Sequence, residues 1–376
     1  MNTLFKPYEE HTFPDWTIEE FDAIECHHHF SGRYQKAKEN ALKKYRRKSF
    51  PAFHLYKAAA AVAACIALPV CVYAAVTHTD FFRNVFGNTG RQSTAAHEEM
   101  IEAGNGGQVA VIYPEREYVS IDEQAAETLI GDQVFSNPIS VDIQDHTLTI
   151  LSAVRDENAI AMEFTLECDT GVTALNYDDL SNETKGAYLS DQATFIFEIE
   201  DTGHKIYVDM EKSTDTSVHG YYYGLYAFGK ALEDGAAPVL NISWADKPWV
   251  TLTEEDHVYE KKITIPAEHA LKELSFLSET GGCLKISPIS CRIDMSKGLG
   301  LTQEEAHDPI HLNTITIRYL DDSEYKVYDR ENSIDNTSYL CGSTDPSILL
   351  AFNRLIDPAN IESVVVNDVS YSPATE

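Results

Sequence analysis

Apolar and polar residues alternate along much of the chain after residue 136, and this two-residue period is typical of half-buried β-strands. Turn-forming residues separate the alternating stretches at intervals that suit a β-sandwich of roughly 110 residues. We therefore predict a first β domain over residues 137–250. Its expected strands are 139–143, 147–154, 160–167, 194–199, 205–210, 218–228 and 239–244.

A second β-rich stretch predicts another domain over residues 256–373. Its expected strands are 258–265, 283–293, 314–319 and 324–328, with hairpin turns at Asp321-Asp322 and Asn367-Asp368. Asp345 followed by Pro346 is typical of a helix start, and we expect this helix to run to Ile356. The predicted fold class is mainly β, with two Ig-like β-sandwich domains.

Residues 58–76 form a continuous uncharged block rich in alanine. Nineteen helical residues span roughly 28 Å, close to the thickness of a bilayer core. Pro69 would kink a soluble helix but is tolerated in one that crosses a membrane. This block predicts one transmembrane helix, and residues 77–136 are expected to form a juxtamembrane stalk with a capping box at Ser120-Ile-Asp-Glu123.

The charge distribution agrees with a membrane boundary. Residues 1–57 contain 10 Lys/Arg and 8 Asp/Glu, a net charge of +2, whereas residues 77–376 contain 19 and 52, a net charge of -33. The positive-inside rule then places the N-terminus in the cytoplasm and the larger part outside the cell membrane. The net charge of -31 argues against nucleic-acid binding.

Three alternatives to a single-pass anchor stay open. Signal-peptidase cleavage after Val72-Tyr73-Ala74 would release the acidic part, although a leader of 57 residues is long for this. Val62-Ala63-Ala64-Cys65 resembles a lipid-attachment site, with little apolar sequence before it. A buried alanine-rich helix in a soluble protein would leave the charge asymmetry unexplained.

The cytoplasmic segment has too few aliphatic residues to bury a core of its own. It is more typical of a peptide that becomes ordered on a partner, although a tail without a partner is the alternative. The candidate partner-binding residues are Trp16, Phe21, Ile24, Phe30 and Tyr34. Cys26-His27-His28-His29 lacks a second cysteine motif for a tetrahedral site, so we favour a solvated helix start there.

The densest aromatic stretch outside the membrane is Tyr221-Tyr222-Tyr223. On a strand, Tyr222 faces one way while Tyr221 and Tyr223 face the other. Tyr221 and Tyr223 are therefore candidates for an outer aromatic surface that binds a glycan or a protein. A half-buried strand with hydroxyl groups at its rim is the alternative that we favour.

We find no residue pattern that indicates an enzyme, a metal site or a cofactor. Asp169-Thr170-Gly171 and Asp201-Thr202-Gly203 are too close in sequence for two protease lobes, and the second suits a hairpin turn. Nucleophile-elbow, zincin and phosphate-loop motifs are missing. The outer cysteines, Cys168, Cys283, Cys291 and Cys341, allow three disulfide pairings.

The layout resembles single-pass bacterial anti-sigma-factor-like membrane proteins with an extracytoplasmic Ig-like domain of unknown function. The matching stretches are His-Phe-Ser-Gly-Arg-Tyr at 29–34, the span at 58–76, Leu-Lys-Ile-Ser-Pro-Ile at 284–289, and 352–361 before Val364-Val365-Val366. The Cys/His zinc motif of better-known anti-sigma domains is missing, since Cys26 stands alone. The resemblance implies a membrane-tethered regulator that is not an enzyme.

Together these patterns predict a regulator that senses the cell envelope through its outer β domains. Residues 1–57 would bind a sigma factor or another cytoplasmic regulator. The alternative is an envelope interaction or adhesion module that binds a wall polymer or protein, with the tail only an anchor.

Overall fold

A computed structural model of the chain describes residues 78–89, 91–102, 108–170, 187–189, 194–209, 211–247, 256–302, 305–306 and 308–374. The chain divides between Ala75 and Val76, so these residues all belong to the unit Val76–Glu376. The predicted cytoplasmic segment and transmembrane helix therefore lie outside the described residues. Within the described part of the chain, no helix combines the length and the hydropathy that crossing a bilayer requires.

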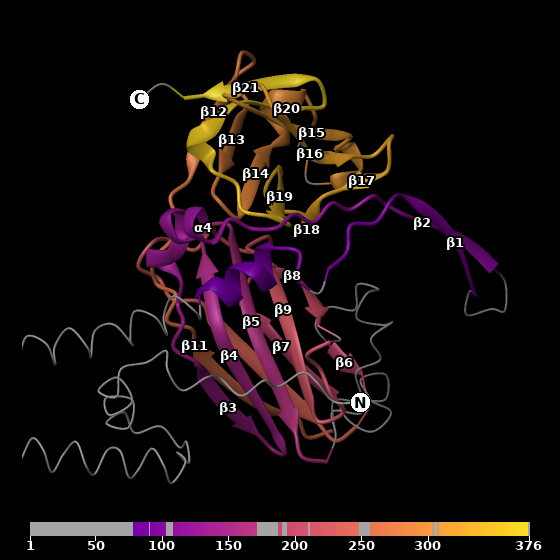
Figure 1. Cartoon of the computed structure of the whole chain (residues 1–376), viewed down its shortest axis with the longest axis vertical. Helices are drawn as coiled ribbons and strands as arrows, with labels where there is room; N and C mark the ends of the chain where they lie inside the picture. Colours follow the sequence, from indigo (N-terminus) through magenta and orange to yellow (C-terminus); the bar gives the residue numbers. More distant parts are fainter. Residues whose placement is uncertain are drawn as a thin grey trace, which may run out of the picture. The chain divides into compact units, whose positions relative to one another are not determined.

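The described unit is mainly β, as predicted, and its strand ladders are antiparallel (Figure 1). Two sheets face each other in its first part. The five-stranded sheet has the order β3 (Ile139–Ile143), β4 (His146–Arg155), β5 (Ala159–Cys168), β9 (Ser217–Leu225) and β8 (Gly203–Val208). The four-stranded sheet has the order β11 (Tyr259–Thr264), β10 (Val239–Ala245), β7 (Thr194–Ile199) and β6 (Ala187–Leu189).

Alternation on these strands builds one core between the two sheets. Phe164 of β5 meets Phe197 of β7 edge to face, with ring centroids 4.9 Å apart. Tyr222 joins the same core from β9, as does Leu240 from β10. Each of these side chains is fully buried, which stabilises the pair of sheets by removing apolar surface from water.

The second part is one continuous sheet of ten strands, which differs from the expected two-sheet sandwich. Its order is β17 (Ile334–Asp335), β16 (Glu324–Asp329), β15 (Thr314–Tyr319), β20 (Ile361–Val366), β21 (Val369–Pro373), β12 (Leu274–Ser278), β13 (Cys283–Ile286), β14 (Ser290–Asp294), β19 (Ser347–Phe352) and β18 (Thr337–Gly342). Side chains from both halves of the sheet, such as Ile317 and Leu350, meet in one core. The turn between β20 and β21 is the predicted one, because Asn367 and Asp368 both adopt left-handed backbone angles.

Short helices and a ribbon complete the described unit. They are η2 (Phe82–Phe86), α4 (Glu123–Ile130), η3 (Gly131–Gln133), α6 (Met295–Leu299), η5 (Pro309–His311), η6 (Pro358–Asn360) and the ribbon of β1 (His97–Glu102) and β2 (Gln108–Tyr113). Asp122, and not Ser120, is the N-cap of α4: its carboxylate accepts from the backbone N–H groups of Gln124 and Ala125. Gly131 is the C-cap of the helix.

Four other expectations differ from the structure. The predicted helix from Asp345 to Ile356 is wrong, because this stretch contains β19. Residues 283–293 form two strands that double back at Pro288, where the alternation predicts one strand. The disulfide pairing stays open in the sequence, and in the structure the four cysteines of the described residues are free thiols. Strand β11 pairs with β10 in the first part of the unit, although we expected it to begin the second. Asp201-Thr202-Gly203 connects β7 in one sheet to β8 in the other, so it is not a hairpin turn.

Candidate functional site

The chain that directly follows the predicted membrane segment is buried in the unit. Phe81, Phe82, Val85 and Phe86 are at most 1% exposed. They share a core with α4, with the face of β5 and β9 that points away from the two-sheet core, and with β19 of the ten-stranded sheet. We call this core the seam. Much of the expected stalk is thus an integral part of the fold.

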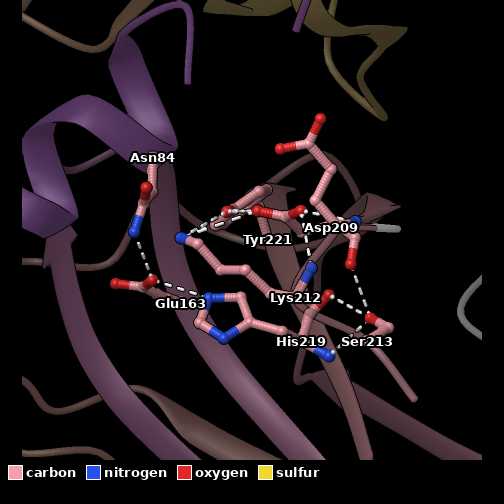
Figure 2. Close-up of polar contacts among 8 residues, drawn as sticks. Asn84, Glu163, Asp209, Lys212, Ser213, His219 and Tyr221 are labelled. Carbon is pink, nitrogen blue, oxygen red and sulfur yellow. Dashed lines mark hydrogen bonds and ion pairs between the residues drawn. The ribbon is translucent and has the colours of Figure 1, made fainter. Parts of the chain in front are cut away.

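A buried carboxylate ties η2 to the five-stranded sheet at the seam (Figure 2). Asn84 Nδ2 donates to Glu163 Oε1 at 2.8 Å, and His219 Nε2 lies 2.7 Å from the same oxygen. Asn84 comes from η2, Glu163 from β5 and His219 from β9. Glu163 and Asn84 are each 5% exposed, so this contact offsets the cost of burying a carboxylate.

A second carboxylate lies beside it, and Figure 2 shows both. The Tyr221 hydroxyl donates to Asp209 Oδ2 at 2.7 Å, and Lys212 Nζ lies 3.5 Å from that oxygen. Burial alone would raise the pKa of Asp209, but the Tyr221 hydrogen bond and the Lys212 charge bring it below its usual value. The pKa of Tyr221 is raised by burial and by the Asp209 carboxylate, which keeps its hydroxyl a donor.

Arg91 places a cation among tyrosine rings at the edge of this network. Its Nη2 donates to the Tyr223 hydroxyl at 2.6 Å, and that hydroxyl donates to the Val85 carbonyl of η2 at 2.6 Å. The guanidinium carbon lies 5.1 to 5.7 Å from the ring centroids of Tyr118, Tyr207, Tyr221 and Tyr223. Such a cage attracts cations through the ring quadrupoles, and here the chain supplies the cation itself.

Arg116 connects the two parts of the unit near a cleft. Its Nη2 pairs with Asp335 Oδ2 at 2.8 Å and its Nη1 donates to the Tyr207 hydroxyl at 3.2 Å. Tyr207 in turn donates to the Ser338 carbonyl at 2.8 Å. The ring of Tyr207 meets that of Tyr223 edge to face at 5.6 Å. Hydrogen bonds, an ion pair and one aromatic contact therefore lead from β17 and β18 through β8 and β9 to η2.

The cleft has a volume of about 750 Å³ and lies between the β7–β8 connection and strands β16 to β18. Its lining includes Arg116, Glu198, Asp201, Lys205, Phe228 and Asp335. The two walls approach closely at Gly203, where a Cβ would lie 2.8 Å from the Tyr339 hydroxyl oxygen and would require the Tyr339 side chain to shift. The mixture of both charges with an exposed phenylalanine suits a polar or charged ligand.

The predicted outer aromatic surface at Tyr221 and Tyr223 is wrong. The predicted alternation is present, since Tyr222 enters the two-sheet core while Tyr221 and Tyr223 enter the seam. However, Tyr221 and Tyr223 are only 2% and 1% exposed, because η2 and Arg91 cover them. The aromatic run of residues 81–86 is the sequence signal for this cover, and it lies in the segment that the sequence predicts to be a stalk.

The predicted partner-binding residues Trp16, Phe21, Ile24, Phe30 and Tyr34 lie outside the described residues.

The Asp201-Thr202-Gly203 motif builds a turn in the structure. Asp201 adopts a left-handed backbone angle, and the Thr202 hydroxyl donates to the Ile199 carbonyl at 2.8 Å. Among the residues that the structure describes, the donor set that could hold a metal ion is Asp145, His146 and Cys168.

Comparison with known proteins gives no family. No family model matches the chain, and no curated protein matches it. The crystal structure of a conserved domain protein from Bacillus anthracis is similar over 62% of this chain and 77% of that one, with 12% identity and a TM-score of 0.34. The crystal structure of the N-terminal periplasmic domain of ScsB from Proteus mirabilis is similar over 64% of this chain and 97% of that one, with 8% identity and a TM-score of 0.20. At these TM-scores neither similarity bears on function.

Proposed function

We propose that the protein is a membrane-anchored regulator that senses a condition or ligand at the cell envelope. In this proposal residues 58–76 cross the membrane once, and the described β unit lies on the extracytoplasmic side. Residues 1–57 bind a sigma factor or another cytoplasmic regulator. The uncharged block between a basic and an acidic part of the chain supports this topology.

The observation that carries the proposal is the burial of η2 in the seam. A stalk would uncouple the outer part from the anchor, because a flexible linker transmits little. Here Phe82 and Phe86, only a few residues after the apolar block, belong to the same buried core as side chains of β9 and β19. A rearrangement between the two β parts would therefore act directly on the chain that enters the membrane.

The contacts at the cleft suggest how a ligand would act. An anionic ligand would compete with Asp335 for Arg116, whose Nη1 also holds Tyr207. Tyr207 packs on Tyr223, and Tyr223 donates to the carbonyl of Val85 in η2. This series of contacts joins the cleft to the start of the described unit.

The finer fold assignment is also a proposal. We infer that the two facing sheets of the first part form an Ig-like sandwich, which their antiparallel order and shared core support.

Affinity capture tests the regulatory function. Residues 1–57 and a scrambled control are immobilised against native cytoplasm, and bound proteins are identified by mass spectrometry. We expect a sigma factor or another transcription regulator to be enriched on the native sequence. Replacing Phe21 and Ile24 with serine should abolish the capture, whereas the matched Phe5→Ser variant should retain it. Equal capture by native and scrambled segments would overturn the proposal.

The ribbon of β1 and β2 favours the second candidate, an envelope interaction module. Its large apolar side chains are exposed, among them Met100 and Ile112 at 56% and 64%. A two-stranded ribbon is marginally stable alone, so such side chains are typical of a surface that binds a partner. If this is the main function, deleting residues 1–30 leaves binding to the envelope intact, and Ile112→Asp weakens it.

A further inference from the structure

A compact set of mixed metal-binding groups lies at the tip of the five-stranded sheet, at the end where β3 turns into β4. His146 begins β4, and it is the direct cross-strand partner of Cys168 at the end of β5. Opposed residues in an antiparallel ladder present their side chains on the same face. Asp145 precedes His146 in the tight turn, so the fold brings three different donor types to one point.

The distances between these groups suit a shared ion. Cys168 Sγ lies 3.5 Å from Asp145 Oδ2, and His146 Nδ1 lies 2.8 Å from Asp145 Oδ1. One ligand atom from each residue can be chosen so that all three lie within 4.8 Å of one another. A tetrahedral zinc ion separates sulfur from nitrogen or oxygen ligands by about 3.5 Å. The distance from Cys168 Sγ to Asp145 Oδ2 already has this value.

The donor types select the class of ion. A thiolate and an imidazole prefer zinc and related transition metals, whereas calcium and magnesium take shells of oxygen ligands. Thr170 Oγ1 lies 3.2 Å from Cys168 Sγ and donates to Asp145 Oδ2 at 3.3 Å, so it can orient the carboxylate.

The three side chains differ in burial, so that the candidate site is closed by the core on one side and open to solvent on the other. Cys168 is 3% exposed and belongs to the two-sheet core. The His146 ring packs on Phe195 with centroids 5.2 Å apart. The Asp145 side chain is 48% exposed, which leaves an entry path from solvent.

We propose that Asp145, His146 and Cys168 bind one Zn²⁺ ion, with the fourth position taken by water. On binding, the Cys168 thiol gives its proton to solvent and the thiolate becomes a ligand, while the carboxylate and the imidazole each donate one lone pair. The site is independent of the proposed regulatory function, since it requires neither the membrane segment nor a cytoplasmic partner.

The test uses the full chain in detergent with Cys26→Ser and His27, His28 and His29 changed to asparagine, which removes competing donors near the N-terminus. Zn²⁺ affinity is measured by competition with a chromophoric chelator, and Co²⁺ substitution reports thiolate ligation through a near-ultraviolet charge-transfer band. We expect one ion per chain and an affinity that rises with pH, because the thiol must lose its proton.

Two ligand variants and one control make the test specific. Asp145→Asn, at an exposed turn, and Cys168→Ser should each weaken Zn²⁺ binding at least tenfold, and Cys168→Ser should also remove the Co²⁺ band. Cys283→Ser, which changes a free thiol in the ten-stranded sheet, should leave both unchanged. The proposal is overturned if the background protein shows no thiolate band, or if Asp145→Asn binds Zn²⁺ as tightly as the background does.

Discussion

Glu273 provides the sharpest test of the buried polar groups that join the two β parts. Its side chain is 8% exposed, Asn158 Nδ2 donates to its Oε1, and Lys285 Nζ lies 3.3 Å from its Oε2. Asp156 is fully buried nearby, where Ser287 and Ser290 donate to its Oδ2. Burial, together with the negative charge of Asp156, raises the pKa of Glu273 from 4.5 to about 7.

The sign of the effect follows from proton binding. Between pH 4.5 and about 7 the folded protein holds a proton on Glu273 that the unfolded chain has released. The stabilisation of the folded state by this bound proton is therefore complete below pH 4.5 and is lost as the pH rises through 7. A shift of one pKa unit corresponds to about 1.4 kcal/mol, so the loss amounts to about 3 kcal/mol.

Glu273→Gln removes this titration while keeping the shape of the side chain. We expect the free energy of unfolding, from urea titrations of the full chain in detergent, to depend less on pH between 5 and 8 than in the native protein. At pH 8 the variant should be the more stable by about 2–3 kcal/mol. Glu260→Gln, at an exposed position on β11, should behave as the native protein does. A Glu273→Gln variant with the native pH slope would refute the reasoning.

Two further substitutions test the seam. Phe82→Ala should lower the free energy of unfolding by about 3–5 kcal/mol in urea titrations, because it empties a fully buried site. The control Ile112→Ala, on the exposed ribbon, should change this free energy by less than about 0.5 kcal/mol. Equal effects of the two substitutions would place η2 outside the core. Tyr221→Phe should cost about 1–3 kcal/mol in the same assay, because Asp209 loses a buried donor, and native stability would mean that this hydrogen bond is not formed.

Local alternation was sufficient to predict many strands. Residues 139–143, 194–199 and 314–319 form strands with the predicted bounds. In each of them one face enters a core and the other points away, which is the situation that a two-residue period describes. The predicted turn at Asn367-Asp368 also forms, because its residues tolerate left-handed angles.

Strand β19 was missed because the local signal pointed elsewhere. Asp345 and Pro346 are favourable at a helix start, and the following run Ser-Ile-Leu-Leu-Ala-Phe does not alternate. In the structure Ile348 and Leu350 enter the core of the ten-stranded sheet, while Leu349 enters the seam. A strand buried on both faces reads as a continuous apolar run, which periodicity alone cannot separate from a buried helix.

The sheet that a strand joins, and the side chains that meet at the seam and at the proposed zinc site, depend on contacts between residues far apart in the sequence. The sequence of β11 predicted a strand, but nothing local indicated that it pairs with β10. The alternation of Tyr221 and Tyr223 was predicted, yet their burial depends on η2, which lies more than 130 residues earlier in the chain. His146 and Cys168 are likewise joined only by the register of β4 and β5.

The proposed function requires that the chain directly after the apolar block is part of the seam. Hydrogen exchange followed by mass spectrometry on the full chain in lipid nanodiscs measures this directly. We predict that the amides of η2 and α4 exchange as slowly as those of β9, and that the β1–β2 ribbon exchanges much faster. If the amides of residues 78–89 exchange as fast as the ribbon, this segment is a linker, and the seam cannot connect the outer β unit to the membrane.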